Sequence, residues 1–294
     1  MSAPLLGDAL GPRGRRRVAI ATVLASLAIV YLVWVAFRRL KDAGQLDAAQ
    51  WELLTRPEVI RFFLGGLANT LKAASLSLVL AATLGGLLAL GRISRSVPVK
   101  TSARAYVEFF RAFPLILLIF FNFFALPQAG INLSRYWALV VALSAYNGAV
   151  FGEIFRAGIL SLDRGQSEAA MSVGLPYWSV MRLVILPQAF RRMTPTIVSQ
   201  SVTLLKDTSL GFVVGFEELL RVGQIAGEFG RNPLQTLLLA ALFYLIVNFT
   251  LSRVARHLEI RQRRRYQAAP IEVAGVEDLV AVGAAAEAQQ PKGH

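Results

Sequence analysis

Six strongly apolar segments, separated by polar and charged stretches, divide this sequence. They are residues 18–37, 67–91, 113–126, 136–160, 194–216 and 234–252. A helix of about 20 apolar residues crosses the hydrocarbon core of a bilayer, and most of these segments reach that length. Gly85 and Gly86, inside the second segment, predict a close approach of helices. The pattern predicts an all-α polytopic membrane protein with six spans.

The composition supports this fold class. Hydrophobic residues make up 55% of the chain and charged residues 17%, with a mean hydropathy of +0.53. A soluble domain carries about a quarter charged residues. The chain has no cysteine, which excludes a disulfide framework and a thiolate metal site.

The N-terminal region begins with a polar tail, residues 1–17, that ends in four arginines. The uncharged residues 18–37 follow directly. Basic residues before an apolar run also occur in secretory signals, but this run is too long and lacks a small-residue cleavage site. We therefore predict a retained first span.

The distribution of basic residues predicts the orientation. With both termini in the cytoplasm, the inner side collects the arginines of the N-terminal tail and the basic residues of 92–112, 161–193 and 253–265. The outer loops carry fewer basic residues, offset by acidic ones, as the positive-inside rule requires. This placement accounts for the net charge of +13 without a nucleic-acid partner. Arg261–Arg265 is expected to attract anionic membrane lipid, and residues 267–294 are expected to be a disordered tail.

The 161–193 segment interrupts the apolar pattern and is predicted to form two short helices. Residues 168–173 favour a helix, and Gly174 is placed to end it in the left-handed conformation. Pro176 suits the first turn of the second helix, and Pro187 is expected to end that helix. Four apolar residues of the second helix fall near the spacing of one face: Trp178, Met181, Val184 and Ile185. A short helix with an apolar face at a membrane surface indicates a protein partner.

Within this segment, Glu168-Ala169-Ala170 is followed by Gly174, then by Val184 and Leu186-Pro187. This spacing resembles the cytoplasmic coupling loop of the permease subunits of bacterial ATP-driven importers, with Val184 where that family usually has Ile. The alternative is an ordinary connecting loop that contains Glu-Ala-Ala by chance. The orientation predicted above places the segment in the cytoplasm without using the motif.

The resemblance covers residues 65–259. It implies a five-span ABC importer permease core with cytoplasmic coupling helices, one extra span at 18–37, and cytoplasmic tails at 1–17 and 260–294, in the bacterial plasma membrane. It implies four partners: a dimer of ATP-binding subunits, a second permease (a heterodimer favoured), an extracytoplasmic solute-binding protein and a polar amino acid. The extra span and the tail are most similar to the longer permease of actinobacterial glutamate importers, while glutamine, arginine and histidine stay open.

Polar and ionisable residues inside spans are costly and are candidate functional residues. The fourth apolar segment contains Asn147, Glu153 and Arg156. Glu153 and Arg156 are three residues apart on one helix face, so a mutual ion pair is one interpretation. A position on a solute path is the other.

The fifth segment contains Lys206-Asp207-Thr208-Ser209. Neighbouring helical residues point about 100° apart, so Lys206 and Asp207 do not readily neutralise each other. They lie roughly 18 Å from Thr194, near the midplane. Residues 204–210 resemble the polar-amino-acid branch of the family, and opposite charges beside hydroxyls suit a zwitterion. A network that holds two permeases together is the alternative.

Several chemistries are excluded by the sequence. It has no Gly-x-x-x-x-Gly-Lys-Ser/Thr phosphate loop, and its only histidines are His257 and His294. A histidine-based triad or metal cluster is thereby excluded, and we expect a non-catalytic subunit with no cofactor whose energy comes from another chain. Two rivals remain: an ATP-independent secondary transporter that uses Glu153, Lys206 and Asp207 as an ion relay, and a non-transporting membrane scaffold.

Overall fold

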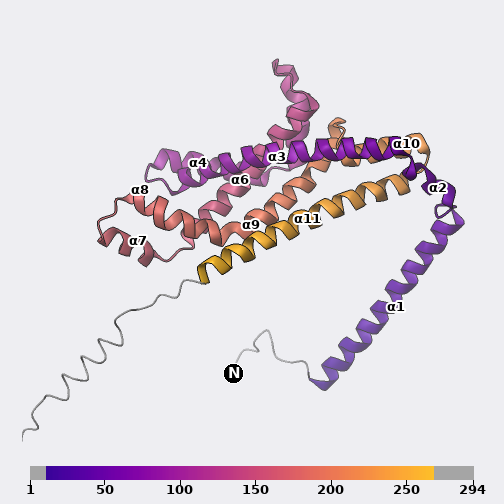
Figure 1. Ribbon diagram of the computed structural model, residues 1–294, viewed down its shortest axis with the longest axis horizontal. Helices are drawn as coiled ribbons and strands as arrows, with labels where there is room; N and C mark the ends of the chain where they lie inside the picture. The colour runs from indigo at the N-terminus through magenta and orange to yellow at the C-terminus, as the bar shows by residue number, and fades with distance from the viewer. Residues whose placement is uncertain (1–10, 268–294) are drawn as a thin grey trace, which may run out of the picture. The chain divides into compact units, whose positions relative to one another are not determined.

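The computed structural model describes residues 11–267, and all regular structure in this range is helical (Figure 1). This confirms the all-α fold class. The α-helices are α1 (Pro12–Asp42), α2 (Ala48–Glu52), α3 (Pro57–Ile93), α4 (Val97–Ala112), α5 (Leu115–Phe120), α6 (Arg135–Leu160), α7 (Arg164–Ser172), α8 (Tyr177–Val180), α9 (Leu186–Asp207), α10 (Leu219–Gly230) and α11 (Pro233–Gln267). The predicted disordered tail lies, apart from Gln267, outside the described residues.

Four described helices are long and apolar enough to cross a membrane: Pro12–Asp42, Pro57–Ile93, Arg135–Leu160 and Pro233–Arg253. A fifth span results if α4 and the helical stretch Leu115–Ala129 count as one broken span. These correspond to five of the six predicted segments. The remaining one, 194–216, is mostly α9, which is too polar to pass the same test. It also ends as an α-helix at Asp207 and continues as a 3₁₀ helix, Thr208–Val214.

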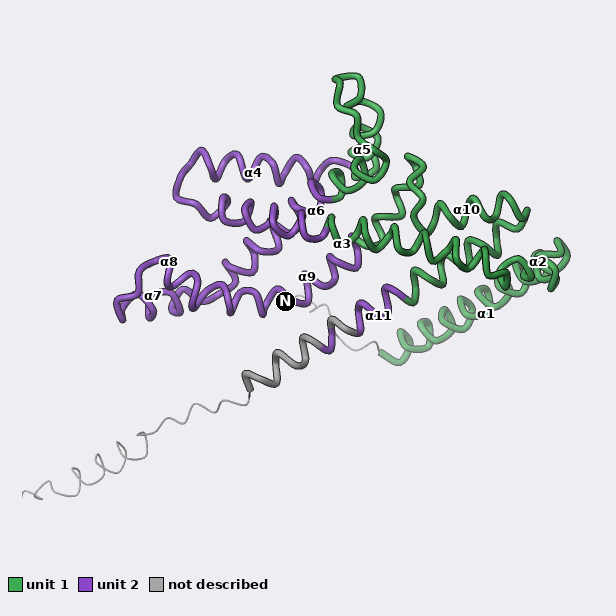
Figure 2. Tube along the Cα trace, turned by 45° about the horizontal axis from the view of Figure 1, so that its top comes forward, with its two compact units in different colours: residues 1–77, 115–143, 205–246 green, residues 78–114, 144–204, 247–294 purple. Residues whose placement is uncertain are grey.

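The chain divides into two compact units (Figure 2). The first comprises Met1–Ser77, Leu115–Leu143 and Leu205–Ile246, and the second comprises Leu78–Pro114, Ser144–Leu204 and Val247–His294. Since α3, α6, α9 and α11 each contribute to both, the units are interleaved along the sequence rather than consecutive domains.

The first unit has a core where α3, α10 and α11 meet. Phe63, Leu219, Val222, Ala226 and Ala240 are buried there. Gly66 permits this packing, because a Cβ atom at that position would lie 2.7 Å from Cγ2 of Val222. Such a distance is well inside van der Waals contact.

The second unit packs α3 against α4 and α6 around Leu88, Val107 and Ala149. A Cβ atom on Gly85 would lie 2.6 Å from Cβ of Phe151, whereas one on Gly86 would meet nothing within 4 Å. The predicted close approach is therefore confirmed at Gly85 alone.

The N-terminal helix α1 has no buried residue. The segment after it is nevertheless attached to the first unit by side-chain hydrogen bonds. Gln235 donates from Nε2 to the carbonyl of Gln45 (2.8 Å), and Asn232 donates from Nδ2 to the carbonyl of Gln50 (2.9 Å). The connection between α1 and α3 is thus held on the turn between α10 and α11.

Candidate functional site

The 161–193 segment folds from its own local signals. Asp163 caps α7 by accepting a hydrogen bond from the backbone N–H of Gly165 (2.8 Å). At the other end, the N–H of Leu175 reaches the carbonyl of Ala170 and the N–H of Gly174 reaches that of Met171. Gly174 has a φ of 84°. This is the helix-ending arrangement that needs a residue in the left-handed region, so the prediction for Gly174 is confirmed.

The expectation for Pro187 is wrong. The helix does not end there: α8 continues through a π-helical turn, Met181–Ile185, directly into α9, where Pro187 is the second residue. Proline has no N–H to offer and clashes with the carbonyl four residues earlier. The wider π-helical turn immediately before Pro187 accommodates the missing N–H and makes room for the proline ring. The helix therefore continues without a break.

The residues of the Glu-Ala-Ala pattern divide between an inner and an outer face of the segment. Ala170 is buried with Val180, Met181 and Ile185, and Val184 packs against this cluster. The outer face consists of the exposed Glu168, Ala169, Gly174, Leu186 and Pro187. The inner members therefore hold α7 against the following helix.

The outer face of the segment also exposes large apolar side chains. Trp178 is 71% exposed and Val173 78%. Three more apolar side chains of the segment are exposed: Met171, Tyr177 and Leu183. Exposed apolar side chains on an otherwise polar segment mark an interaction surface.

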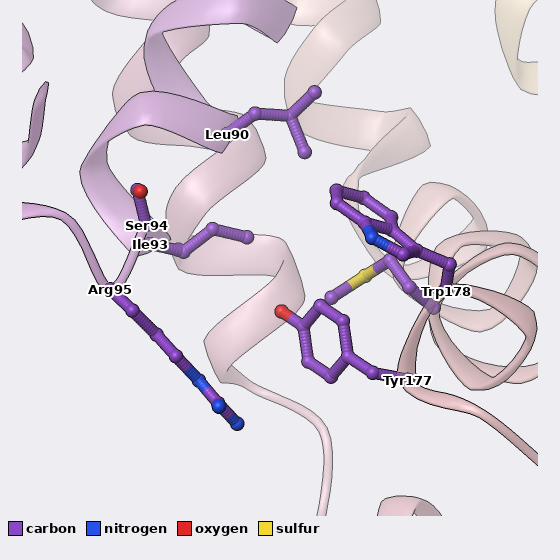
Figure 3. A pocket seen from close by; sticks show the side chains of 7 residues that line it. Leu90, Ile93, Ser94, Arg95, Tyr177 and Trp178 are labelled. Carbon is purple, nitrogen blue, oxygen red and sulfur yellow. The ribbon is translucent and has the colours of Figure 1, made fainter.

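A pocket of about 350 Å³ adjoins this surface. Figure 3 shows Tyr177 and Trp178 of α8 facing Leu90 and Ile93 from the end of α3. The guanidinium carbon of Arg95 lies 5.8 Å from the centroid of the Tyr177 ring, within cation–π range. The end of α3 is thus tied to the 161–193 segment.

Glu153 on α6 lies between two cations. It pairs with Arg156 (3.2 Å from Nε), which confirms the predicted pair three residues apart, and also with Arg92 at the end of α3. Arg92 is 61 positions from Glu153, and no local sequence pattern indicates this second pair. Asn147 is fully buried, and Gln200 of α9 donates a hydrogen bond to it (2.8 Å).

The four consecutive candidates at the end of α9 have different environments. Lys206 is exposed, Asp207 and Ser209 are half-buried, and Thr208 is buried with its hydroxyl donating to the carbonyl of Leu205 (2.6 Å). Among the described residues, neither Lys206 nor Asp207 forms an ion pair. Asn147 and Glu153 belong to the second unit, and the other four candidates to the first.

Lys206 is the last member of an exposed row on α9. We name this row the α9 stripe: Arg192, Pro195, Thr196, Ser199, Thr203 and Lys206. Steps of three and four residues keep its members on one helix face. The sequence analysis missed all but Lys206, although the periodicity was present in the sequence.

In the first unit, Glu218 is fully buried. Its carboxylate caps α10 by accepting the N–H groups of Leu220 and Arg221 (2.8 Å each), and Tyr244 donates its hydroxyl to it (2.7 Å). Burial raises the pKa of Glu218, while these hydrogen bonds act in the opposite direction. The network fixes the segment before α10 rather than forming a titratable site.

The chain is similar to known membrane transport proteins. The family model "Binding-protein-dependent transport system inner membrane component" matches residues 81–264. The "Probable glutamine ABC transporter permease protein GlnP" of Bacillus subtilis is 43% identical over 209 residues, which cover 70% of this chain and 95% of that protein. The "Glutamate transport system permease protein GluD" of Corynebacterium glutamicum is 38% identical over 229 residues, covering 76% and 84%.

A solved structure shares the fold. The crystal structure of an amino acid ABC transporter with histidines has a TM-score of 0.68 and 31% identity, and the match covers 71% of this chain and 98% of that one. The similarity therefore includes almost the whole of that permease. Nearly three tenths of the present chain lies outside the match.

Proposed function

Because the chain belongs to the family of binding-protein-dependent transport system inner membrane components, we propose that it carries glutamate through the membrane in an ATP-driven importer. It is a permease subunit of an amino-acid ABC importer, a transport component of the bacterial inner membrane. The single observation that carries the proposed coupling to an ATPase is the set of exposed apolar side chains on the 161–193 segment.

This surface is the docking site for the ATP-binding subunits. Glu168 and Ala169 lie on its polar side, while Val173 and Trp178 supply apolar area that would otherwise remain in water. Closure of the ATPase dimer would displace α7 and α8 together, because Ala170 packs into the cluster that joins them. Since the π-helical turn runs without a break into α9, the displacement passes directly to that helix.

The solute path lies along the α9 stripe. Lys206 is 14 residues from Arg192, which corresponds to about 21 Å along a helix, so both cannot reach the same membrane surface. An exposed ammonium without an ionic partner is too costly in hydrocarbon. The hydroxyl of Thr203 donates to the carbonyl of Ser199 (3.1 Å) yet remains able to accept. The stripe is therefore expected to face water, the solute and a second permease.

The charge of the stripe favours both a heterodimer and an anionic solute. Its only ionisable members, Arg192 and Lys206, are cations. Two identical stripes facing each other would oppose like charges, which a second permease of different sequence avoids. A solute with two carboxylates would be attracted to such a path, in agreement with glutamate and with the named role of GluD.

The proposed function also assigns the termini and α10 to the two sides of the membrane. Both termini lie in the cytoplasm, as the basic residues predict, and α10 lies on the outer side. The extracytoplasmic solute-binding protein docks there, on a helix anchored through Glu218 and through Asn69, which donates to the carbonyl of Glu217 (2.9 Å).

The test is ATP hydrolysis by the purified complex, reconstituted with its binding protein, against a panel of amino acids. Stimulation by glutamate supports the whole proposal, and stimulation only by glutamine, arginine or histidine overturns the substrate while keeping the coupling. Uptake that resists vanadate but collapses with a protonophore would instead establish the secondary transporter.

A further inference from the structure

A groove of about 350 Å³ lies between α6 and α9, within the second unit. It is adjacent to the two ends of the 161–193 segment, because α6 leads into that segment and α9 leads out of it. Its lining combines charged, hydroxyl and apolar groups: Glu153, Ile154, Ala157, Gly158, Ser161, Arg192, Met193 and Thr196. A volume of this order accommodates a small metabolite.

The two charged residues of the groove, Glu153 and Arg192, differ in their ionic partners. Glu153 already pairs with Arg92 and Arg156. Arg192 donates one hydrogen bond, from Nη1 to the carbonyl of Ser161 (2.6 Å), and within the described part of the chain no carboxylate lies within ion-pair distance of it. The groove therefore has an excess of positive charge, and Arg192 keeps free donors for an anion.

The shape of the groove results from small residues on α6. A Cβ atom on Gly158 would lie 3.0 Å from the sulfur of Met193, so the two helices are already in close contact beneath the groove. Ala157 and Gly158 leave space above that contact, and Thr196 lines it one turn from Arg192. A planar carboxylate suits the fork of a guanidinium, with a hydroxyl beside it.

We propose that this groove binds the carboxylate of the transported amino acid from the cytoplasmic side, and that the accumulated product thereby slows transport. The inference rests on the proposed function, because it takes the α9 stripe as the solute path. A glutamate held through its carboxylate by Arg192 on α9 also fills the space beside Ala157 and Gly158 on α6. It stabilises one relative position of the two helices that flank the 161–193 segment and opposes the movement that ATPase closure requires.

The experiment uses the complete complex in proteoliposomes with ATP inside and the binding protein and radiolabelled glutamate outside. Initial uptake is measured against increasing luminal L-glutamate, with potassium chloride as the ionic-strength control. Wild-type uptake is expected to fall as luminal glutamate rises. Arg192→Gln should raise the half-inhibitory concentration at least about tenfold, the usual effect of losing a charged hydrogen-bonded pair. Thr196→Val should raise it less.

Arg191→Gln is the matched control. It removes the same charge one position away, on a different face of α9 and outside the groove lining, and should keep the wild-type half-inhibitory concentration. Equal sensitivity of the Arg192 and Arg191 variants, or no luminal inhibition of an active wild-type complex, overturns the groove site alone. Absence of ATP-dependent glutamate uptake in every sample overturns the proposed function and this inference together.

A second readout does not depend on transport. Thermal unfolding of the detergent-purified complex, without binding protein, is followed with and without L-glutamate. Ligand bound to the folded state raises Tm. The rise should occur in wild type and Arg191→Gln and disappear in Arg192→Gln, and an equal rise in both variants would contradict the site.

Discussion

The helices α1 and α9 are both exposed along much of their length, yet they expose opposite kinds of side chain. In α1, residues 18–37 are apolar all round the helix and none is buried. In α9, Leu186 and Phe190 at the start are exposed, but from Arg192 onward the exposed face is the polar α9 stripe, and the apolar residues Leu204 and Leu205 are buried. The exposed side chains of α1 and those of the α9 stripe therefore require different surroundings.

The difference follows from the solvent that each surface tolerates. An apolar helix surface is stable in lipid without any protein partner, so α1 needs nothing to cover it. Unpaired charges and hydroxyls lose hydrogen bonds in hydrocarbon, so the α9 stripe requires water or protein. In the proposed function, α1 lies in lipid and the α9 stripe lies in the interior of the assembled transporter.

The largest expected effect comes from making α9 resemble α1. Replacing Thr196, Ser199 and Thr203 together by Leu removes the hydroxyls that the solute path offers, and uptake should fall at least about 100-fold with a normal amount of protein in the membrane. The matched control places three Leu residues on α1, at Ala21, Ala25 and Ala28, and should transport like wild type. Similar losses in both triple variants would refute the distinction.

A smaller but still large loss of stimulated ATP hydrolysis is expected from variants that disrupt the proposed coupling between α9 and the ATPase. Gly174→Val places a β-branched residue at a φ of 84°, and Glu168→Lys reverses a charge on the docking face. In both variants, glutamate-stimulated ATP hydrolysis should drop about tenfold or more while the permease remains in the membrane. Wild-type uptake in either variant would show that the 161–193 segment does not transmit ATPase closure.

The smallest effect is expected from replacing α1 by a different apolar helix. If lipid is its only neighbour, a Leu/Ala sequence of equal length at residues 18–37 should leave uptake within about twofold of wild type. Quantitative immunoblotting of membrane fractions corrects for differences in amount. A loss of uptake greater than tenfold at equal amounts would mean that α1 has a specific protein contact.

Much of the 161–193 segment and one ion pair of α6 were predictable, because their signals are local. The glycine that ends α7 and the ion pair of Glu153 with Arg156 depend on neighbours within a few positions. Arg92 was not predictable as a second partner of Glu153, since only the packing of α3 on α6 brings them together. Pro187 was expected to end the helix, but a single π-helical turn before it accommodates the hydrogen bond that proline cannot donate. Such a turn leaves no clear signal in the sequence.

The all-α fold class was predictable from hydropathy. The polar face of α9 was predicted only in part. Its mixture of apolar and polar residues was interpreted as one more span, and only its two charged residues near the end were singled out. Applying the helical period to the polar residues would have found the α9 stripe.

The most direct test of the account is the reactivity of single cysteines, which is simple here because the chain has none of its own. Cysteines at Thr196, Ser199 and Thr203 are compared with cysteines at Leu24, Leu27 and Val30, using a charged, water-soluble methanethiosulfonate in intact proteoliposomes. The reactive species is the thiolate, which forms in water and not in lipid. The account predicts rapid labelling of the α9 positions, slowed by glutamate, and no labelling of the α1 positions. Unreactive α9 cysteines beside reactive α1 cysteines would contradict it.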